Sequence, residues 1–193
     1  MSTPRNTADD ILRCARTLVV AGGYNGFSYA DIAAVVGIRK ASIHHHFPGK
    51  VDLVRALVVQ YRDEAEAGLA ALARHHPEPL DQLRAYIGFW EGCIGDGSLS
   101  FCVCALLACE IPALPPEVAQ EVTAYFRGLS AWLAAVMDQG AAGGTMVLPA
   151  PPRVAAESFM ATVHGAMLSA RACGDPAIFG MITRPLIDRL AAV

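Results

Sequence analysis

Cationic and imidazole side chains gather in one short stretch of this 193-residue chain. Its only two lysines, Lys40 and Lys50, lie within "DIAAVVGIRKASIHHHFPGK", residues 31–50, together with three consecutive histidines. Ammonium and guanidinium groups donate hydrogen bonds to phosphate oxygens and to guanine O6 and N7, and imidazole N–H groups can reach phosphates. The chemistry that this stretch favours is recognition of a polyanion.

Charge is distributed unevenly along the chain. Residues 1–50 hold six Lys/Arg against three Asp/Glu, whereas the remainder holds nine against fifteen. The acidic remainder argues against a protein that compacts DNA nonspecifically, because such a protein would be basic throughout. We therefore expect only one end of the chain to contact DNA.

The elements that carry these residues are predicted to be helices. Apolar residues recur at helical spacing almost everywhere, and no run of β-branched residues alternates convincingly with polar ones. The stretch "SYADIAAVV" begins with Ser28 as N-cap and Asp31 in capping-box position, and it ends at Gly37. The sequence therefore predicts an all-α fold.

About nine helices are expected, and Gly- and Pro-rich stretches separate most of them. The first three are compact and basic, and they end at Gly22-Gly23, Gly37 and Pro48-Gly49. The other six are expected at 51–75, 80–94, 99–111, 117–139, 153–173 and 177–192.

Two short helices joined by a glycine-centred turn predict a helix-turn-helix. Gly37 tolerates the left-handed backbone angles that such a turn needs. The second helix of the pair lies in the DNA major groove with its first turn nearest the bases, and here that turn is residues 39–42. Lys50 begins the next helix, whose unpaired amides favour a phosphate contact.

The three histidines are not expected to form a metal site. Successive helical positions point about 100° apart, so one ion cannot bind all three side chains. We expect His44 and His45 to face DNA and His46 to pack or hydrogen-bond inward. Ordinary solvated charge remains the alternative for the two lysines.

This stretch resembles the DNA-binding domain of the TetR family of transcriptional regulators. The resemblance runs from "ILRCARTLVVAGGYNGFSYADIA" through "VVGIRKASIHHHFPGKVDLVRAL", with glycine turn, capped helix, basic recognition helix, His-Phe pair and following lysine in family order. The family usually has Tyr where His44 stands and Phe where Val19 stands. The resemblance implies a DNA-binding domain at 1–50 and a helical ligand-binding and dimerisation domain at 51–193, with the last two helices pairing across a two-fold axis.

The predicted DNA contacts combine the recognition helix, the helix cap and the start of the long fourth helix. They are Ser28, Tyr29, Arg39, Lys40, Ala41, Ser42, His44, His45 and Lys50.

In the second domain, apolar and aromatic residues recur at helical spacing, and most are expected to be core. The resemblance implies that some of them line a ligand cavity between helices. The candidates are Tyr86, Phe89, Trp90, Cys93, Phe101, Cys104, Trp132, Met137, Met160, His164 and Met167. Glu110, His164 and Arg171 are polar groups on otherwise apolar faces; we expect them to be paired, and orienting a ligand is the alternative.

The six cysteines are expected to be thiols, because they lie on apolar segments. In "FCVCALLACE" the spacing of Cys102 and Cys109 places both on one helix face, with Cys104 nearly opposite. Buried inert thiols are the expectation. The alternative is a sensor at Cys102 or Cys104 that reacts with an oxidant or an electrophile.

These observations predict a homodimeric, ligand-responsive, one-component repressor that binds a palindromic operator and is released by a small apolar inducer. Thiol sensing is the alternative, and a thiol-dependent enzyme using His164 is a remote one, since no nucleophile-and-base signature is present. No cofactor, metal or membrane partner is expected. The longest apolar run has nine residues and the first fifteen carry no signal-like segment, so we expect a cytoplasmic protein.

Overall fold

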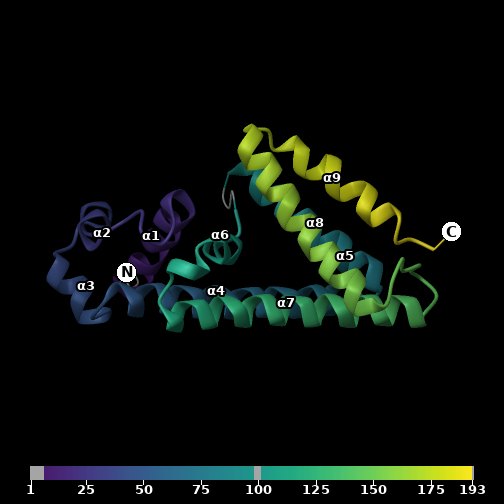
Figure 1. Cartoon of the computed structure of the whole chain (residues 1–193), viewed down its shortest axis with the longest axis horizontal. Coiled ribbons are helices and arrows are strands. Elements are labelled where there is room, and N and C mark those ends of the chain that lie inside the picture. The colour runs from purple at the N-terminus through teal and green to yellow at the C-terminus, as the bar shows by residue number, and fades with distance from the viewer. Residues whose placement is uncertain (1–6, 98–100, 193) are drawn as a thin grey trace, which may run out of the picture. The chain divides into compact units, whose positions relative to one another are not determined.

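The computed structural model describes residues 7–97 and 101–192, and within these ranges the chain forms nine α-helices and one 3-10 turn. Figure 1 shows them in chain order. Their bounds are α1 Thr7–Gly22, α2 Tyr29–Val36, α3 Lys40–His46, α4 Lys50–His75, α5 Pro79–Asp96, α6 Val103–Cys109, η1 Ile111–Ala113, α7 Pro116–Ala142, α8 Pro152–Cys173 and α9 Ala177–Asp188. The described residues contain no strand beyond a single bridge between Met146 and Ala191. The all-α prediction is confirmed.

The chain packs as two compact units that are not continuous in sequence. The first comprises Met1–Asp63 with Val103–Tyr125, and the second comprises Glu64–Cys102 with Phe126–Val193. Helices α4 and α7 each contribute to both units. This division describes packing, and the domain boundary at residue 50 stays a prediction.

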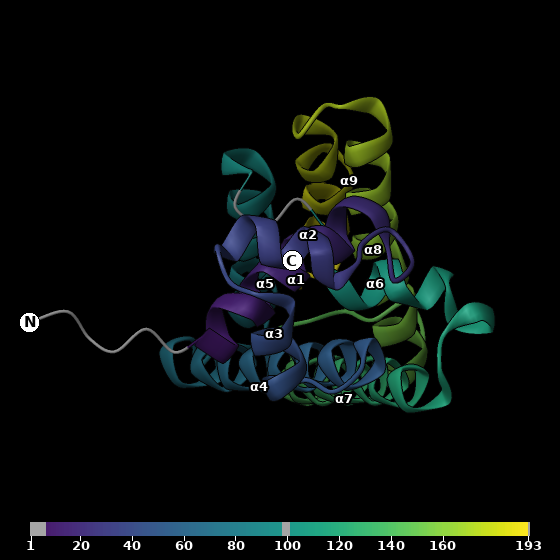
Figure 2. The same cartoon turned by 90° about the vertical axis from the view of Figure 1, so that its left-hand side faces the viewer.

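Apolar side chains on one face of each short helix form the core of the first unit. Ile11 and Val19 of α1, Ile32 of α2 and Ile43 of α3 have no exposed surface. Burial of a side chain of this size contributes about 1.5–3 kcal/mol. Helix α1 contacts both α2 and α3. Figures 1 and 2 show the three helices in one group at the N-terminal end of the chain. The core therefore fixes the orientation of α3.

The second unit contains α5, α8, α9 and the C-terminal parts of α4 and α7. Phe159 of α8 and Phe179 of α9 are almost completely buried, as are Leu83 of α5 and Met137 of α7. Helix α9 packs against both α8 and α5. The apolar periodicity of this part of the sequence is thus explained by a helical core.

The helix expected at 99–111 is shorter in the structure. It begins at Val103, and residues 98–100 lie outside the described part of the chain. Cys102 therefore precedes the helix, and the expectation that Cys102 and Cys109 share a helix face is wrong.

The last helix also ends earlier than predicted, at Asp188 instead of 192. Pro185 lies inside it and cannot donate a backbone hydrogen bond. Beyond the helix, the Leu190 carbonyl accepts from the Val147 N–H at 2.9 Å. The chain end pairs with the α7–α8 connection instead of continuing the helix.

None of the helices in the described ranges combines the length and the apolar composition that a bilayer crossing requires.

Candidate nucleic-acid interface

The turn and cap of the helix-turn-helix have the geometry that the sequence predicts. The Ser28 hydroxyl accepts from the Ala30 N–H at 3.2 Å, and the Ser28 N–H donates to Asp31 at 2.7 Å. The Ser28 hydroxyl and amide hold the pKa of the Asp31 carboxyl below its usual range, because both donate to the ionised form. Gly37 has φ +75° and donates to the Ala33 carbonyl at 3.0 Å. These interactions set the angle at which α3 leaves α2.

Helix α3 presents a cationic first turn to solvent. Arg39, Lys40 and Ala41 are exposed, and Ser42 is half-buried. Ile43 is fully buried and faces the core. Two positive side chains and a hydroxyl therefore share the exposed side of a helix whose other side is held by the core.

The histidines occupy the last turn of α3, and all three are exposed. His44 Nδ1 lies 3.1 Å from the Pro48 carbonyl oxygen, which can only accept a hydrogen bond. This assigns the proton of neutral His44 to Nδ1, so donation from Nε2 to a phosphate requires the imidazolium. The expectation that His46 packs inward is wrong, because the helix ends there and Phe47 fills the buried position.

Lys50 and Tyr29 are both bonded within the first unit. The Lys50 ammonium donates to the Phe27 carbonyl and lies 4.2 Å from the Phe27 ring centroid and 5.1 Å from that of Tyr24. Burial lowers the pKa of Lys50. The Tyr29 hydroxyl donates to the Phe47 carbonyl at 2.9 Å, and burial raises the pKa of Tyr29 to about 12. A phosphate contact from either side chain stays a prediction.

Known proteins resemble both halves of the chain. The family model "Bacterial regulatory proteins, tetR family" matches residues 11–57, and the model "Tetracyclin repressor-like, C-terminal domain" matches residues 79–185. A TetR-family transcriptional regulator from Agrobacterium tumefaciens of known crystal structure is 65% identical, with a TM-score of 0.96 over 98% of this chain and 100% of that one. The chain belongs to the TetR family.

Two more distant proteins resemble this chain, one in its fold and one in part of its sequence. The reduced form of NemR from E. coli is 18% identical, with a TM-score of 0.84 over 97% of this chain and 98% of that one. The nucleoid occlusion factor SlmA of Pectobacterium carotovorum is 29% identical over 84 residues. That match spans 43% of this chain and 42% of SlmA, so it covers less than half the length of the curated relative.

Glu110 was expected from the sequence to be paired, but its partner could not be named. Its carboxylate accepts from the Tyr24 N–H at 2.8 Å, so it is paired as expected. Gly23 adjoins the same carboxylate, and a Cβ at Gly23 would lie 1.8 Å from a Glu110 oxygen. Glu110 directly follows α6, and Gly23 and Tyr24 follow α1, so one carboxylate joins the ends of two helices of the first unit.

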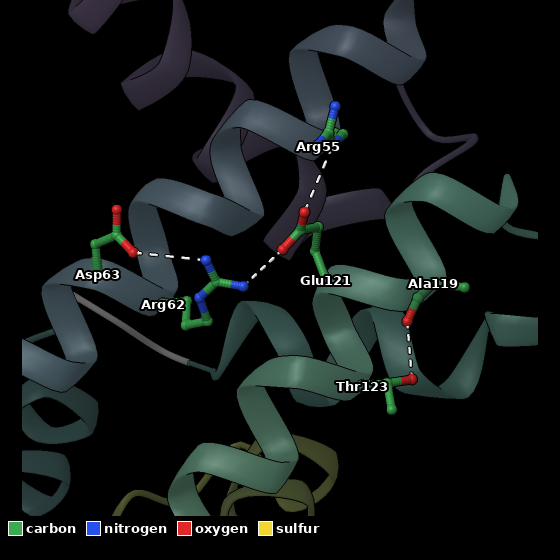
Figure 3. Close-up of polar contacts among 6 residues, drawn as sticks. All are labelled: Arg55, Arg62, Asp63, Ala119, Glu121 and Thr123. Atoms are coloured by element: carbon green, nitrogen blue, oxygen red, sulfur yellow. Dashed lines mark hydrogen bonds and ion pairs between the residues drawn. The ribbon is translucent and has the colours of Figure 1, made fainter.

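A second polar link in the first unit joins α4 to α7. Figure 3 shows the Glu121 carboxylate between two arginines of α4, at 2.7 Å from Arg62 Nη1 and 3.4 Å from Arg55 Nε. Arg62 also lies 3.8 Å from Asp63. The sequence carried no signal of this network, because Glu121 is 59 and 66 residues from the arginines that it contacts.

The predicted ligand-binding residues differ in their surroundings. Tyr86, Trp90, Phe101, Met137, Met160 and Met167 are buried, Cys93, Trp132 and His164 are half-buried, and Phe89 is 53% exposed. The Tyr86 and Trp132 ring centroids are 5.7 Å apart. Cys104 belongs to the first unit, whereas the other candidates belong to the second.

All six cysteines lie within the described residues, and none forms a disulfide. Cys102 and Cys104 have no exposed surface, whereas Cys109 and Cys173 are exposed. The first two thiols are buried as expected, and their lack of reactivity stays a prediction.

Proposed function

We propose that this TetR-family transcriptional regulator is a homodimeric repressor that binds a palindromic operator through α3 and is released when a small apolar molecule binds in the second unit. The observation that carries the DNA-binding part is the exposed first turn of α3, where Arg39 and Lys40 stand on a helix fixed by a core contact and a glycine turn. Such a turn reads base edges and phosphates in the major groove. The protein acts in the cytoplasm, without a cofactor and without enzymatic activity of its own.

Dimerisation is supported by apolar surface on the last two helices. Val154 and Leu168 of α8 are 53% and 58% exposed, and Met181 of α9 is 70% exposed. A second copy of the chain that packs on this surface would remove it from water. Deletion of α9 is a poor test, because Phe179 belongs to the core. Leu168→Glu combined with Met181→Glu should instead yield a folded monomer in sedimentation, and a persisting dimer would refute this interface.

The DNA-binding proposal is tested on a palindromic sequence from the DNA that flanks the gene, where regulators of this kind often bind. Lys40→Ala should weaken operator binding and lower the slope of log K against log salt by about one unit per half-site, because one phosphate or base contact is lost. Arg74→Ala is the matched control, since Arg74 is an exposed cation near the end of α4. Equal affinity and slope in the two variants would refute the role of Lys40.

Ligand response is supported by the aromatic interior of the second unit. Tyr86, Trp90 and Trp132 are buried or half-buried on α5 and α7, the type of surface that binds small apolar molecules in helical bundles. Both tryptophans of the chain are in this group, so their fluorescence reports binding directly. An apolar molecule that quenches them and lowers operator affinity would support the proposal, and quenching without loss of operator affinity would refute the inducer role.

The thiol-sensing alternative receives no support from Cys102 and Cys104, because reagents in solution reach buried thiols slowly.

A further inference from the structure

Two buried polar atoms of the second unit make no hydrogen bond with the described residues. They are the Tyr86 hydroxyl oxygen on α5 and His164 Nε2 on α8. Buried polar atoms in native proteins are paired with few exceptions, and leaving one unpaired is unfavourable. Each of these atoms therefore has capacity for a partner from outside the chain.

The tautomer of His164 defines what its buried atom can bind. The ring donates to the backbone of Met160, one turn earlier in α8, and burial lowers the pKa of His164 to about 4. The ring is thus neutral near pH 7, with its proton on the nitrogen that faces the Met160 carbonyl. His164 Nε2 is left as a hydrogen-bond acceptor, and it needs a donor.

Tyr86 has the complementary capacity. Burial and the nearby Cys102 raise the pKa of Tyr86, so the hydroxyl keeps its proton. The Trp90 indole offsets part of this increase in pKa. An indole N–H can only donate, so Trp90 cannot accept the Tyr86 proton. No hydrogen bond to the hydroxyl has normal geometry. The Tyr86 O–H is therefore available to donate to an acceptor.

The two side chains lie against one short stretch of α7. The Tyr86 ring is 5.7 Å from Trp132, and the His164 ring is 5.3 Å from Phe126. Residues 126 and 132 are separated by about 9 Å along a helix axis. Ser130 lies between them and donates to a Glu157 carboxylate oxygen of α8 at 2.6 Å, which holds α8 against this stretch. A molecule of bicyclic size is long enough to match this separation along the helix axis.

We propose that the inducer is an uncharged aromatic molecule with one hydrogen-bond donor, which binds His164 Nε2, and one acceptor, which binds the Tyr86 hydroxyl. The inference rests on the proposed ligand response and adds the chemical class of the ligand. Both anchors are neutral, so an anion at this place would lose its hydration without gaining a counter-charge from them. Arg171 lies over the Phe101 ring at 5.2 Å and is exposed, so it does not provide a buried counter-charge.

The test uses three probes with one naphthalene core: 2,6-dihydroxynaphthalene, its dimethyl ether and naphthalene-2,6-dicarboxylate. Binding is measured by tryptophan quenching and by the shift in melting temperature, neither of which requires DNA. The diol should bind most tightly, the ether about tenfold more weakly because it has no donor, and the dianion not measurably.

Three variants identify the anchors. Tyr86→Phe and His164→Leu should each weaken diol binding about tenfold, since each removes one hydrogen bond. His75→Leu is the matched control, because His75 makes the same type of bond to a carbonyl four residues earlier, at 2.7 Å, but is exposed. Tyr86→Phe should leave the melting temperature of the ligand-free protein unchanged or raise it, because the hydroxyl that it removes makes no hydrogen bond within the described structure.

Four results would overturn the inference: no binding of the diol, equal binding of the ether or the dianion, unchanged diol affinity in both anchor variants, or a melting temperature of Tyr86→Phe several degrees below wild type. Operator affinity is measured separately with the diol present. Diol binding through both anchors without operator release would uphold the ligand class and refute the proposed inducer response, so the two failures are distinguishable.

Discussion

Gly23→Ala tests the contact between the end of α1 and Glu110. Gly23 has φ +75°, where a residue with a Cβ is strained by about 1–2 kcal/mol. The new Cβ would also lie 1.8 Å from Glu110 Oε1, so the carboxylate has to move and lose its bond to the Tyr24 N–H. A hydrogen bond to a charged group contributes about 1.5–3 kcal/mol. The two effects together predict a destabilisation of about 2.5–5 kcal/mol.

Urea denaturation at fixed protein concentration measures this loss, and Gly37→Ala provides the matched control. Gly37 has the same φ of 75° and ends a helix of the same unit, but a Cβ there meets nothing within 4 Å. Gly37→Ala should therefore cost only the backbone strain, about 1–2 kcal/mol.

The double variant Gly23→Ala/Glu110→Ala separates the collision from the strain. With the carboxylate removed, the alanine at position 23 should add only the strain, which gives a coupling energy of about 1.5–3 kcal/mol between the two sites. Equal costs of Gly23→Ala and Gly37→Ala, or additive losses in the double variant, would refute the reasoning.

Further predictions concern the α4–α7 link, a buried imidazole and the thiols. Glu121→Gln should lower the free energy of unfolding by about 1–2 kcal/mol. The control Asp81→Asn breaks an exposed ion pair of 2.8 Å and should cost less than about 0.5 kcal/mol. Similar losses in the two variants would contradict a stabilising role of the Glu121 link. The pKa of His164 is lowered to about 4, so its contribution to stability is present above pH 6.5 and is lost as the pH falls toward 4, by up to about 3 kcal/mol. His164→Leu should remove that part of the acid dependence in denaturation curves, and an unchanged slope would count against a buried neutral ring. Under iodoacetamide, mass spectrometry should find Cys109 and Cys173 modified well before the two buried thiols of "FCVC", and equal rates would show that this segment opens readily.

Features governed by neighbouring residues could be predicted from the sequence. The capping box of Ser28 and Asp31 and the left-handed Gly37 follow from rules that act within four residues, and both are present. The buried positions of the first three helices follow from helical spacing, because one face of each short helix has to meet the core.

Contacts between distant segments could not be predicted. Glu110 and Tyr24 are 86 residues apart, and nothing in either local sequence indicates that a carboxylate meets that N–H. Lys50 was expected to point outward from the start of a helix, but two aromatic rings and a carbonyl 23 residues earlier bind its ammonium. The apolar spacing also predicted a helix at Cys102, but Phe101 and Cys102 are not helical.

The placement of the two lysines determines how the protein reacts with amine-selective reagents. Lys50 is half-buried and hydrogen-bonded, so Lys40 is the only exposed ε-amine among the described residues. Acylation would therefore remove a positive charge from the recognition helix, and protection of Lys40 from acylation would serve as a single-site footprint of bound DNA. By the same logic, coupling the protein to a surface or a dye through its ε-amines attaches it through the recognition helix that is proposed to meet DNA. Linkage through the exposed thiol of Cys173, which belongs to the second unit, leaves Lys40 unmodified.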